Sequence, residues 1–177
     1  MTEPNQPPLI LTLQLDEAAF TFFNDLRQKY FPPAINYLDA HLTLFHHLPN
    51  IQAITNLLTT VAGKQPVINL EVTHLMKLGR GVAYAVKSDE LLQLHHYLQR
   101  QWPEYLTPQD RQGLRPHVTV QNKVTPEMAD KLFQELATEF VPFAAEGIGL
   151  SLWEYQGGPW GKIKDLPFRP ASTGTNI

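Results

Sequence analysis

The chain has 177 residues, of which 43% are hydrophobic and 18% are charged, and its formal net charge is −3. This length is enough for one folded domain, and the apolar share and moderate charge argue against an intrinsically disordered chain. It also argues against a protein that grips long nucleic acid through a broad basic surface, because that mode needs many phosphate-neutralising lysines and arginines. A short RNA end or a small nucleotide, held by a few local groups, remains compatible with the charge.

The chain contains no cysteine, which excludes disulfides, thiolate catalysis and cysteine-rich zinc sites. Residues 1–8 are polar and proline-rich, without the basic and apolar regions of a signal peptide. No apolar run approaches the roughly 20 residues that a membrane-spanning helix needs. We therefore expect a cytoplasmic protein, and we expect a monomer.

The first half of the chain predicts strand, helix, strand, helix and strand in that order. Residues 9–15 alternate in polarity, as expected for a strand with one buried face. Asp16 stands at the N-cap of a helix over 17–30, which ends before Pro32 and Pro33. The other predicted elements of this half are a strand over 41–47, a helix capped by Asn50 that runs to Val61, and a strand over 67–76.

The same order recurs in the second half. Its predicted elements are a strand over 82–86, a helix from Asp89 to about Trp102, a strand over 117–121, a helix with Thr125 as N-cap and Pro126 at its first position, a strand over 143–155 and a last strand over 160–168. We therefore predict an α+β fold with two pseudo-symmetric lobes of mostly antiparallel sheet, outer helices and a central cleft. We expect the whole chain, 1–177, to form this single bilobal domain, with repeat halves at about 9–78 and 79–168 and flexible tails at 1–8 and 169–177.

Each half contains one strand of the pattern His-apolar-Thr-apolar. These strands are His41-Leu42-Thr43-Leu44 and His117-Val118-Thr119-Val120. Because alternate side chains of a strand share a face, each histidine lies beside its threonine while the apolar residues enter the core. If the halves are related by a pseudo-twofold axis, the two pairs face each other across the cleft.

Two imidazoles and two hydroxyls suit the opening of a 2′,3′-cyclic phosphate. One histidine deprotonates the attacking hydroxyl or water, and the other protonates the departing ribose oxygen on the far side of phosphorus. The threonines donate hydrogen bonds to the nonbridging phosphate oxygens. This chemistry requires no cofactor and no metal, and the sequence has no cluster of carboxylates at ligand spacing.

With both motifs in view, the chain resembles the 2H phosphoesterase superfamily, which includes the bacterial 2′–5′ RNA ligases, over residues 9–168. The resemblance implies His41 and His117 as catalytic residues, and Thr43 and Thr119 as phosphate binders. It implies action on a 2′,3′-cyclic phosphate or a 2′–5′ phosphodiester. Several members of the RNA ligase type carry an arginine after the second motif, whereas residues 121–124 of this chain read Gln-Asn-Lys-Val.

Three further residues are candidates for substrate binding. Phe45 and Gln121 each follow a motif threonine by two positions, so strict alternation predicts that they share its face. Phe45 could then stack on a base, and Gln121 could contact a phosphate or a base edge; packing of Phe45 between the lobes is an equal alternative. Arg115 lies two residues before His117 and could reach a phosphate or remain a solvated loop arginine. The aromatic residues around the Gly157-Gly158 turn suit either a nucleobase platform or the closing of a core.

Two other classes of function stay open on the sequence alone. A non-catalytic module that recognises RNA ends or cyclic nucleotides is compatible with the same motifs, although retention of both histidines favours the enzyme. A metal-dependent hydrolase is disfavoured by the absence of ligand clusters. The substrate classes left open are RNA with a 2′,3′-cyclic phosphate, ADP-ribose cyclic phosphate and other small cyclic nucleotides.

Overall fold

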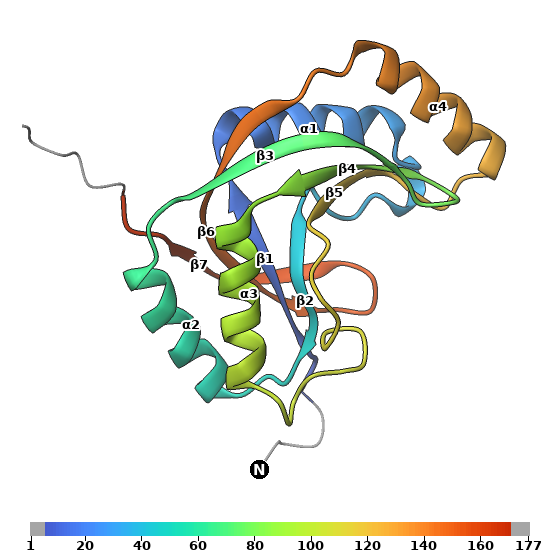
Figure 1. Ribbon diagram of the computed structural model, residues 1–177. Coiled ribbons are helices and arrows are strands. Elements are labelled where there is room, and N and C mark those ends of the chain that lie inside the picture. Colours follow the sequence, from blue (N-terminus) through green and yellow to red (C-terminus); the bar gives the residue numbers. More distant parts are fainter. Residues whose placement is uncertain (1–5, 171–177) are drawn as a thin grey trace, which may run out of the picture.

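Seven strands form one antiparallel sheet in the computed structural model, which describes residues 6–170 (Figure 1). Residues 1–5 and 171–177 of the predicted tails lie outside the described residues. The strands are β1 (Leu9–Leu15), β2 (Leu42–Leu48), β3 (Ile68–Lys77), β4 (Val82–Lys87), β5 (His117–Gln121), β6 (Phe143–Tyr155) and β7 (Trp160–Pro167). The sequence therefore predicted the position of every strand to within about two residues.

Four α-helices and one 3-10 helix connect the strands. They are α1 (Glu17–Tyr30), η1 (Pro33–Ile35), α2 (Gln52–Lys64), α3 (Asp89–Gln101) and α4 (Pro126–Glu139). The side chains of Asp16, Ser88 and Thr125 cap α1, α3 and α4, each accepting the main-chain N–H three residues on. The prediction that Asn50 caps α2 is wrong, because the N-cap residue is Ile51 and no side chain caps this helix. None of the helices formed by residues 6–170 has the length and apolarity that a membrane crossing requires.

The order of strands in the sheet is pseudo-symmetric. It runs β2-β1-β6-β3-β4-β5, and β7 pairs with the outer part of β6. If β1 is exchanged with β4, β2 with β5 and β3 with β6, the result is the same order counted from the other end of the sheet. The predicted α+β fold with pseudo-symmetric lobes is therefore confirmed. The axis lies between β3 and β6, and each lobe contains one strand from the other half of the chain. β3, from the first half, joins β4 and β5, while most of β6, from the second half, joins β1 and β2.

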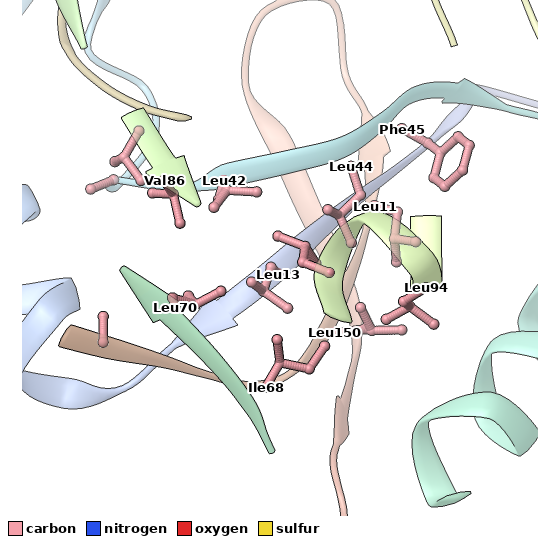
Figure 2. Packing of buried hydrophobic residues seen from close by; sticks show 14 of the residues in the cluster. Leu11, Leu13, Leu42, Leu44, Phe45, Ile68, Leu70, Val86, Leu94 and Leu150 are labelled. Carbon is pink, nitrogen blue, oxygen red and sulfur yellow. The ribbon is translucent and has the colours of Figure 1, made fainter. Parts of the chain in front are cut away.

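The helices divide between the two lobes. In Figure 1, α1 and α4 lie together at one end of the sheet, and α2 and α3 lie together at the other. Figure 2 shows the core near α3, where Leu94 and the labelled leucines of β1, β2, β3 and β6 belong to one buried cluster. Burying each such side chain stabilises the fold by about 1.5–3 kcal/mol. This apolar layer holds the inner faces of the strands in place and leaves their opposite faces free for polar groups.

The two ends of the sheet, β2 and β5, contact each other. Among residues 6–170, β2 pairs only with β1 and β5 pairs only with β4, so the sheet curls until its two edge strands meet. These are the strands that carry the two His-apolar-Thr-apolar motifs. The pseudo-symmetry of the fold thus brings the two motifs together from positions far apart in the sequence.

Candidate active site

His41 directly precedes β2, and the side chains of Thr43, His117 and Thr119 lie on the faces of β2 and β5 that point away from the core. Leu42 and Leu44 are buried on one strand, and Val118 and Val120 are buried on the other. Between them the histidines and threonines remain partly exposed. The strand register places Thr43 opposite Thr12 of β1, and Thr119 opposite Ala83 of β4. The alternation expected within each motif is therefore present in the structure.

Both histidines are held in the same way. His41 Nδ1 lies 2.7 Å from the main-chain oxygen of Asp39, and His117 Nδ1 lies 2.7 Å from that of Arg115. A carbonyl oxygen only accepts hydrogen bonds, so Nδ1 must carry the proton in each ring. The nitrogen of each imidazole that this contact leaves free is then Nε2, which can accept a proton when the ring is neutral and donate one when it is charged. The two rings are thus oriented by equivalent contacts in the two halves of the fold.

The environment of His41 favours its neutral form. Burial lowers the pKa of His41 to about 4, the hydrogen bond to Asp39 opposes this, and the positive charges of Arg27, His117 and His46 lower the pKa further. The influence of His117 reflects the proximity of the two motifs. At neutral pH the Nε2 atom of His41 in the unliganded protein is therefore a proton acceptor.

A buried arginine connects the second motif with the segment that precedes the first. Arg27 of α1 is only 5% exposed. Its Nε donates to Asn36 Oδ1 at 3.0 Å and to the Leu38 oxygen at 2.9 Å, and its Nη1 donates to the Thr119 oxygen at 3.0 Å. The guanidinium carbon lies 4.0 Å from the centre of the Phe31 ring. Although burial lowers the pKa of Arg27 to about 10, the group stays charged at neutral pH and so places a cation behind the site.

The sequence analysis missed Arg27, yet a signal was present. The buried residues of α1 are Ala19, Phe23 and Arg27, at a spacing of four. A cation on the apolar stripe of an amphipathic helix must find acceptors when the helix packs, because an unpaired buried charge is costly. The chain has no arginine in the four residues after Val120, and Arg27 reaches this strand from α1 instead.

Phe45 and Gln121 do not share the face of the motif threonines, so their predicted orientation is wrong. Consecutive pairs in the register are Leu11 with Phe45 and Thr12 with Thr43, which leaves Leu44 as the extra residue of a β-bulge. The bulge turns Phe45 into the core, where it is fully buried and its ring stacks on His95 at 4.6 Å between centroids. Phe45 has no surface to offer a base.

An equivalent bulge lies at the end of the second motif. Val82 pairs with Gln121 and Ala83 pairs with Thr119, which leaves Val120 as the extra residue. Gln121 is 4% exposed, and its Oε1 is buried without a hydrogen-bond partner among the described residues. The shared bulges are a further element of the pseudo-symmetry, and they explain why the alternation breaks after the last motif residue in each half.

The loop before the second motif is fixed to the first motif strand by a buried carboxylate. Asp110 Oδ1 accepts the main-chain N–H of His46 at 2.9 Å, and Oδ2 accepts that of His47 at 2.9 Å. This contact was not foreseen from the sequence. Arg115, at the end of the same loop, is exposed and contributes its main-chain oxygen to His117. Its side chain remains a proposed substrate contact only.

A cavity of about 370 Å³ lies beside His41. Its walls come from β1, from α1, from residues 36–41 and from the strands β6 and β7, and they include Trp153, Trp160 and Lys162. The Trp160 ring lies 4.8 Å from the His41 ring between centroids. No group of three or more His, Asp or Glu residues in the described part of the chain is arranged to hold a metal ion.

A curled antiparallel sheet with one His-apolar-Thr-apolar strand at each edge defines a two-histidine phosphoesterase fold. The family model of the 2′-5′ RNA ligase superfamily matches residues 15–159. The chain belongs to this superfamily. Comparison with curated proteins finds no match.

Several solved structures share the fold. TT0787 of Thermus thermophilus is 15% identical at a TM-score of 0.64, covering 92% of this chain and 98% of that one. A protein described as a phosphoesterase is 18% identical at a TM-score of 0.57, covering 93% and 99%. E. coli LigT complexed with 3′-AMP is 19% identical at a TM-score of 0.55, covering 93% and 99%. At these identities the likeness concerns the fold.

Proposed function

We propose that this protein is a metal-independent phosphoesterase that acts on 2′,3′-cyclic phosphate or 2′–5′ phosphodiester ends of RNA or nucleotides. The observation that carries the proposal is the matched pair of hydrogen bonds from His41 and His117 to main-chain oxygens two residues before them. These contacts leave the same ring nitrogen, Nε2, free for proton transfer in both histidines. An in-line displacement at phosphorus needs two such groups, one for the attacking oxygen and one for the leaving oxygen.

The reaction uses each group of the site once. One Nε2 removes the proton of the attacking water or hydroxyl as its oxygen bonds to phosphorus. The other Nε2 gives a proton to the ribose oxygen as the bond from phosphorus to that oxygen breaks. The hydroxyls of Thr43 and Thr119 donate hydrogen bonds to the nonbridging oxygens, and the charge of Arg27 behind β5 offsets the charge of the phosphate.

The family and the solved structures are consistent with this substrate class. E. coli LigT has been solved with 3′-AMP and with phosphate. 3′-AMP carries its phosphate on a ribose oxygen, as does the product of opening a 2′,3′-cyclic phosphate. We extend this chemistry to the present chain because it has both histidines and both threonines in the arrangement described above.

The test is to incubate the protein with the four 2′,3′-cyclic mononucleotides, with and without EDTA, and to identify the product isomer by chromatography. We expect one isomer of nucleoside monophosphate to form, at a rate that EDTA leaves unchanged, since imidazoles handle both protons. Turnover that EDTA abolishes and a divalent metal restores would instead indicate a metal-dependent hydrolase. Binding of the nucleotides without turnover would indicate a recognition module.

A further inference from the structure

The face of the sheet that contains His117 continues from β5 across β4 to β3. Ala85 of β4 pairs with His117 on one side and with His74 of β3 on the other. Residues that are directly opposite each other in a sheet share a face. These three side chains therefore form one row that points away from the core, in which the two imidazoles are separated by a single methyl side chain.

Lys87, the last residue of β4, belongs to the same face. Alternate residues of a strand share a face, and Val86 is buried in the core whereas Lys87 is exposed. Lys87 lies two residues along and one strand across from His117, which corresponds to roughly 8 Å between the two Cα atoms. The ammonium group ends a flexible four-carbon chain, so it can reach a group bound next to His117.

Arg115 brings a second cation to the same end of β4. Its main-chain oxygen lies 2.7 Å from His117 Nδ1, and the oxygen of the next residue, Pro116, accepts the main-chain N–H of Val86 at 2.9 Å. Arg115 is exposed. The ion pairs found among residues 6–170 include neither Lys87 nor Arg115, so both charges are available to a ligand.

Equivalent positions in the first half of the chain have no cation. The residue whose main-chain oxygen orients the motif histidine is Asp39 in the first half and Arg115 in the second. The strand next to the motif strand ends in Lys87 in the second half, whereas β1 ends in Leu15 and is followed by Asp16. The pseudo-symmetric fold therefore does not itself require cations at these positions, and their presence beside only one histidine points to a ligand.

We propose that Lys87 and Arg115 bind a second, unreactive phosphate of the substrate, the one on the 5′ oxygen of the ribose that carries the cyclic phosphate. Ammonium and guanidinium groups both suit a phosphate. Glu71 is opposite Lys87 on β3, and it leaves the two cations with a net positive charge. The inference rests on the proposed function and narrows its substrate class. An RNA end and ADP-ribose cyclic phosphate both have a phosphate at this position, whereas a cyclic mononucleoside phosphate does not.

The test compares adenosine 2′,3′-cyclic phosphate with the same compound carrying a 5′-phosphate. Hydrogen bonds between charged groups are the strong ones, so we expect wild-type kcat/KM to be about tenfold or more higher with the 5′-phosphate. Salt should reduce this preference, because the two cations are exposed. The variants Lys87→Gln and Arg115→Gln should lose most of the preference.

Two matched variants separate this effect from a general change in charge. Glu71→Gln removes the acid opposite Lys87, so it should increase the preference for the 5′-phosphate. Lys131→Gln removes an exposed cation of α4 and should retain the wild-type preference.

Equal kcat/KM for the two substrates in the wild type, or an undiminished preference in both Lys87→Gln and Arg115→Gln, would overturn the subsite. Absence of turnover of both substrates would instead refute the proposed function. In that case calorimetric titration with 3′-AMP and with adenosine 3′,5′-bisphosphate decides the subsite by itself. Tighter binding of the bisphosphate that Lys87→Gln weakens supports it, and equal binding of the two ligands contradicts it.

Two larger substrates identify the source of the second phosphate. One is a diadenosine RNA that ends in a 2′,3′-cyclic phosphate, and the other is ADP-ribose cyclic phosphate. A decrease of kcat/KM in Lys87→Gln with the dinucleotide identifies the phosphodiester of an RNA end. A decrease confined to ADP-ribose cyclic phosphate identifies the diphosphate of a small nucleotide.

Discussion

Arg27 Nη1 donates a hydrogen bond to the main-chain oxygen of Thr119 at 3.0 Å, across 92 positions of the sequence. The same guanidinium donates to the Leu38 oxygen, three residues before His41. One side chain on α1 therefore positions both the segment before the first motif and the middle of the second motif. The distance between the two histidines thus depends on how α1 packs against the sheet.

Replacement of Arg27 by Met should destabilise the protein and impair catalysis together. Met fills much of the volume, but it leaves the oxygens of Leu38 and Thr119 without their charged donor. We expect the free energy of unfolding in urea to fall by about 2–4 kcal/mol, in line with the loss of hydrogen bonds to a charged group. Arg27→Lys keeps the charge but not the planar guanidinium, so its free energy of unfolding should lie between those of the wild type and Arg27→Met. Unchanged stability and unchanged kcat/KM in Arg27→Met would show that the guanidinium does not organise the site.

The dependence of activity on pH should have an unusually low acid limb. Burial lowers the pKa of His41 from 6.5 to about 4, so the ring is neutral above that pH and becomes charged as the pH falls through it. The mechanism requires one neutral and one charged histidine, so kcat/KM should fall as pH drops through about 4. The measurement is kcat/KM from pH 3 to 9, with circular dichroism at each pH to verify folding. An acid limb near 6.5 would mean that the surroundings of His41 do not disfavour its charge.

Loss of either motif hydroxyl should reduce the rate without affecting the fold. Thr43→Val and Thr119→Val keep shape and strand preference, and each removes one hydrogen bond to a charged oxygen. The expected cost is about 1.5–3 kcal/mol in transition-state binding, seen as a decrease in kcat/KM of roughly ten- to a hundredfold. The Ser variants, which retain the hydroxyl, should keep most of the activity. If the Val and Ser variants at each position behave alike, the hydroxyls do not bind the phosphate.

Asp110 should stabilise the folded protein at neutral pH, and this contribution to the free energy of unfolding should disappear at acid pH. Burial alone would raise its pKa, but the hydrogen bonds from the His46 side chain and from the main chain of His46 and His47 outweigh burial and lower it. An acid with a lowered pKa in the folded state stabilises the protein above its ordinary pKa, and this contribution is lost as pH falls through the folded value. Asp110→Asn should therefore cost about 1–3 kcal/mol at pH 7, by urea denaturation, and less below pH 3.8. The exposed Asp25→Asn serves as the control, and a difference between Asp110→Asn and wild type that does not vary with pH would contradict this account.

The sequence predicted the elements of this fold well because their signals are local. The alternation of Leu9–Leu15 and the caps Asp16 and Thr125 depend on neighbours in the chain, and they define β1, α1 and α4. The two motifs likewise follow strand alternation over four residues. The internal repeat predicted that the two motifs lie close together, and the pseudo-symmetric order of the strands agrees with that repeat.

Side-chain directions beyond the motifs could not be predicted in the same way. The bulges at Leu44 and Val120 depend on how β2 and β5 pair with their neighbours, and each reverses the face of the next residue. Phe45 and Gln121 were therefore assigned to the wrong face. Arg27 and Asp110 act through contacts distant in sequence. Such partners become visible only when the chain is folded.

The most direct test of the account is the turnover of a 2′,3′-cyclic mononucleotide by His41→Ala, by His117→Ala and by the double variant, with EDTA present. If the two imidazoles act in one displacement, each single variant should lose most of the rate, by about 10²–10⁴-fold. The double variant should then be little slower than either, because residues that act as a unit are not additive. Near-wild-type turnover in either single variant would contradict the two-histidine mechanism.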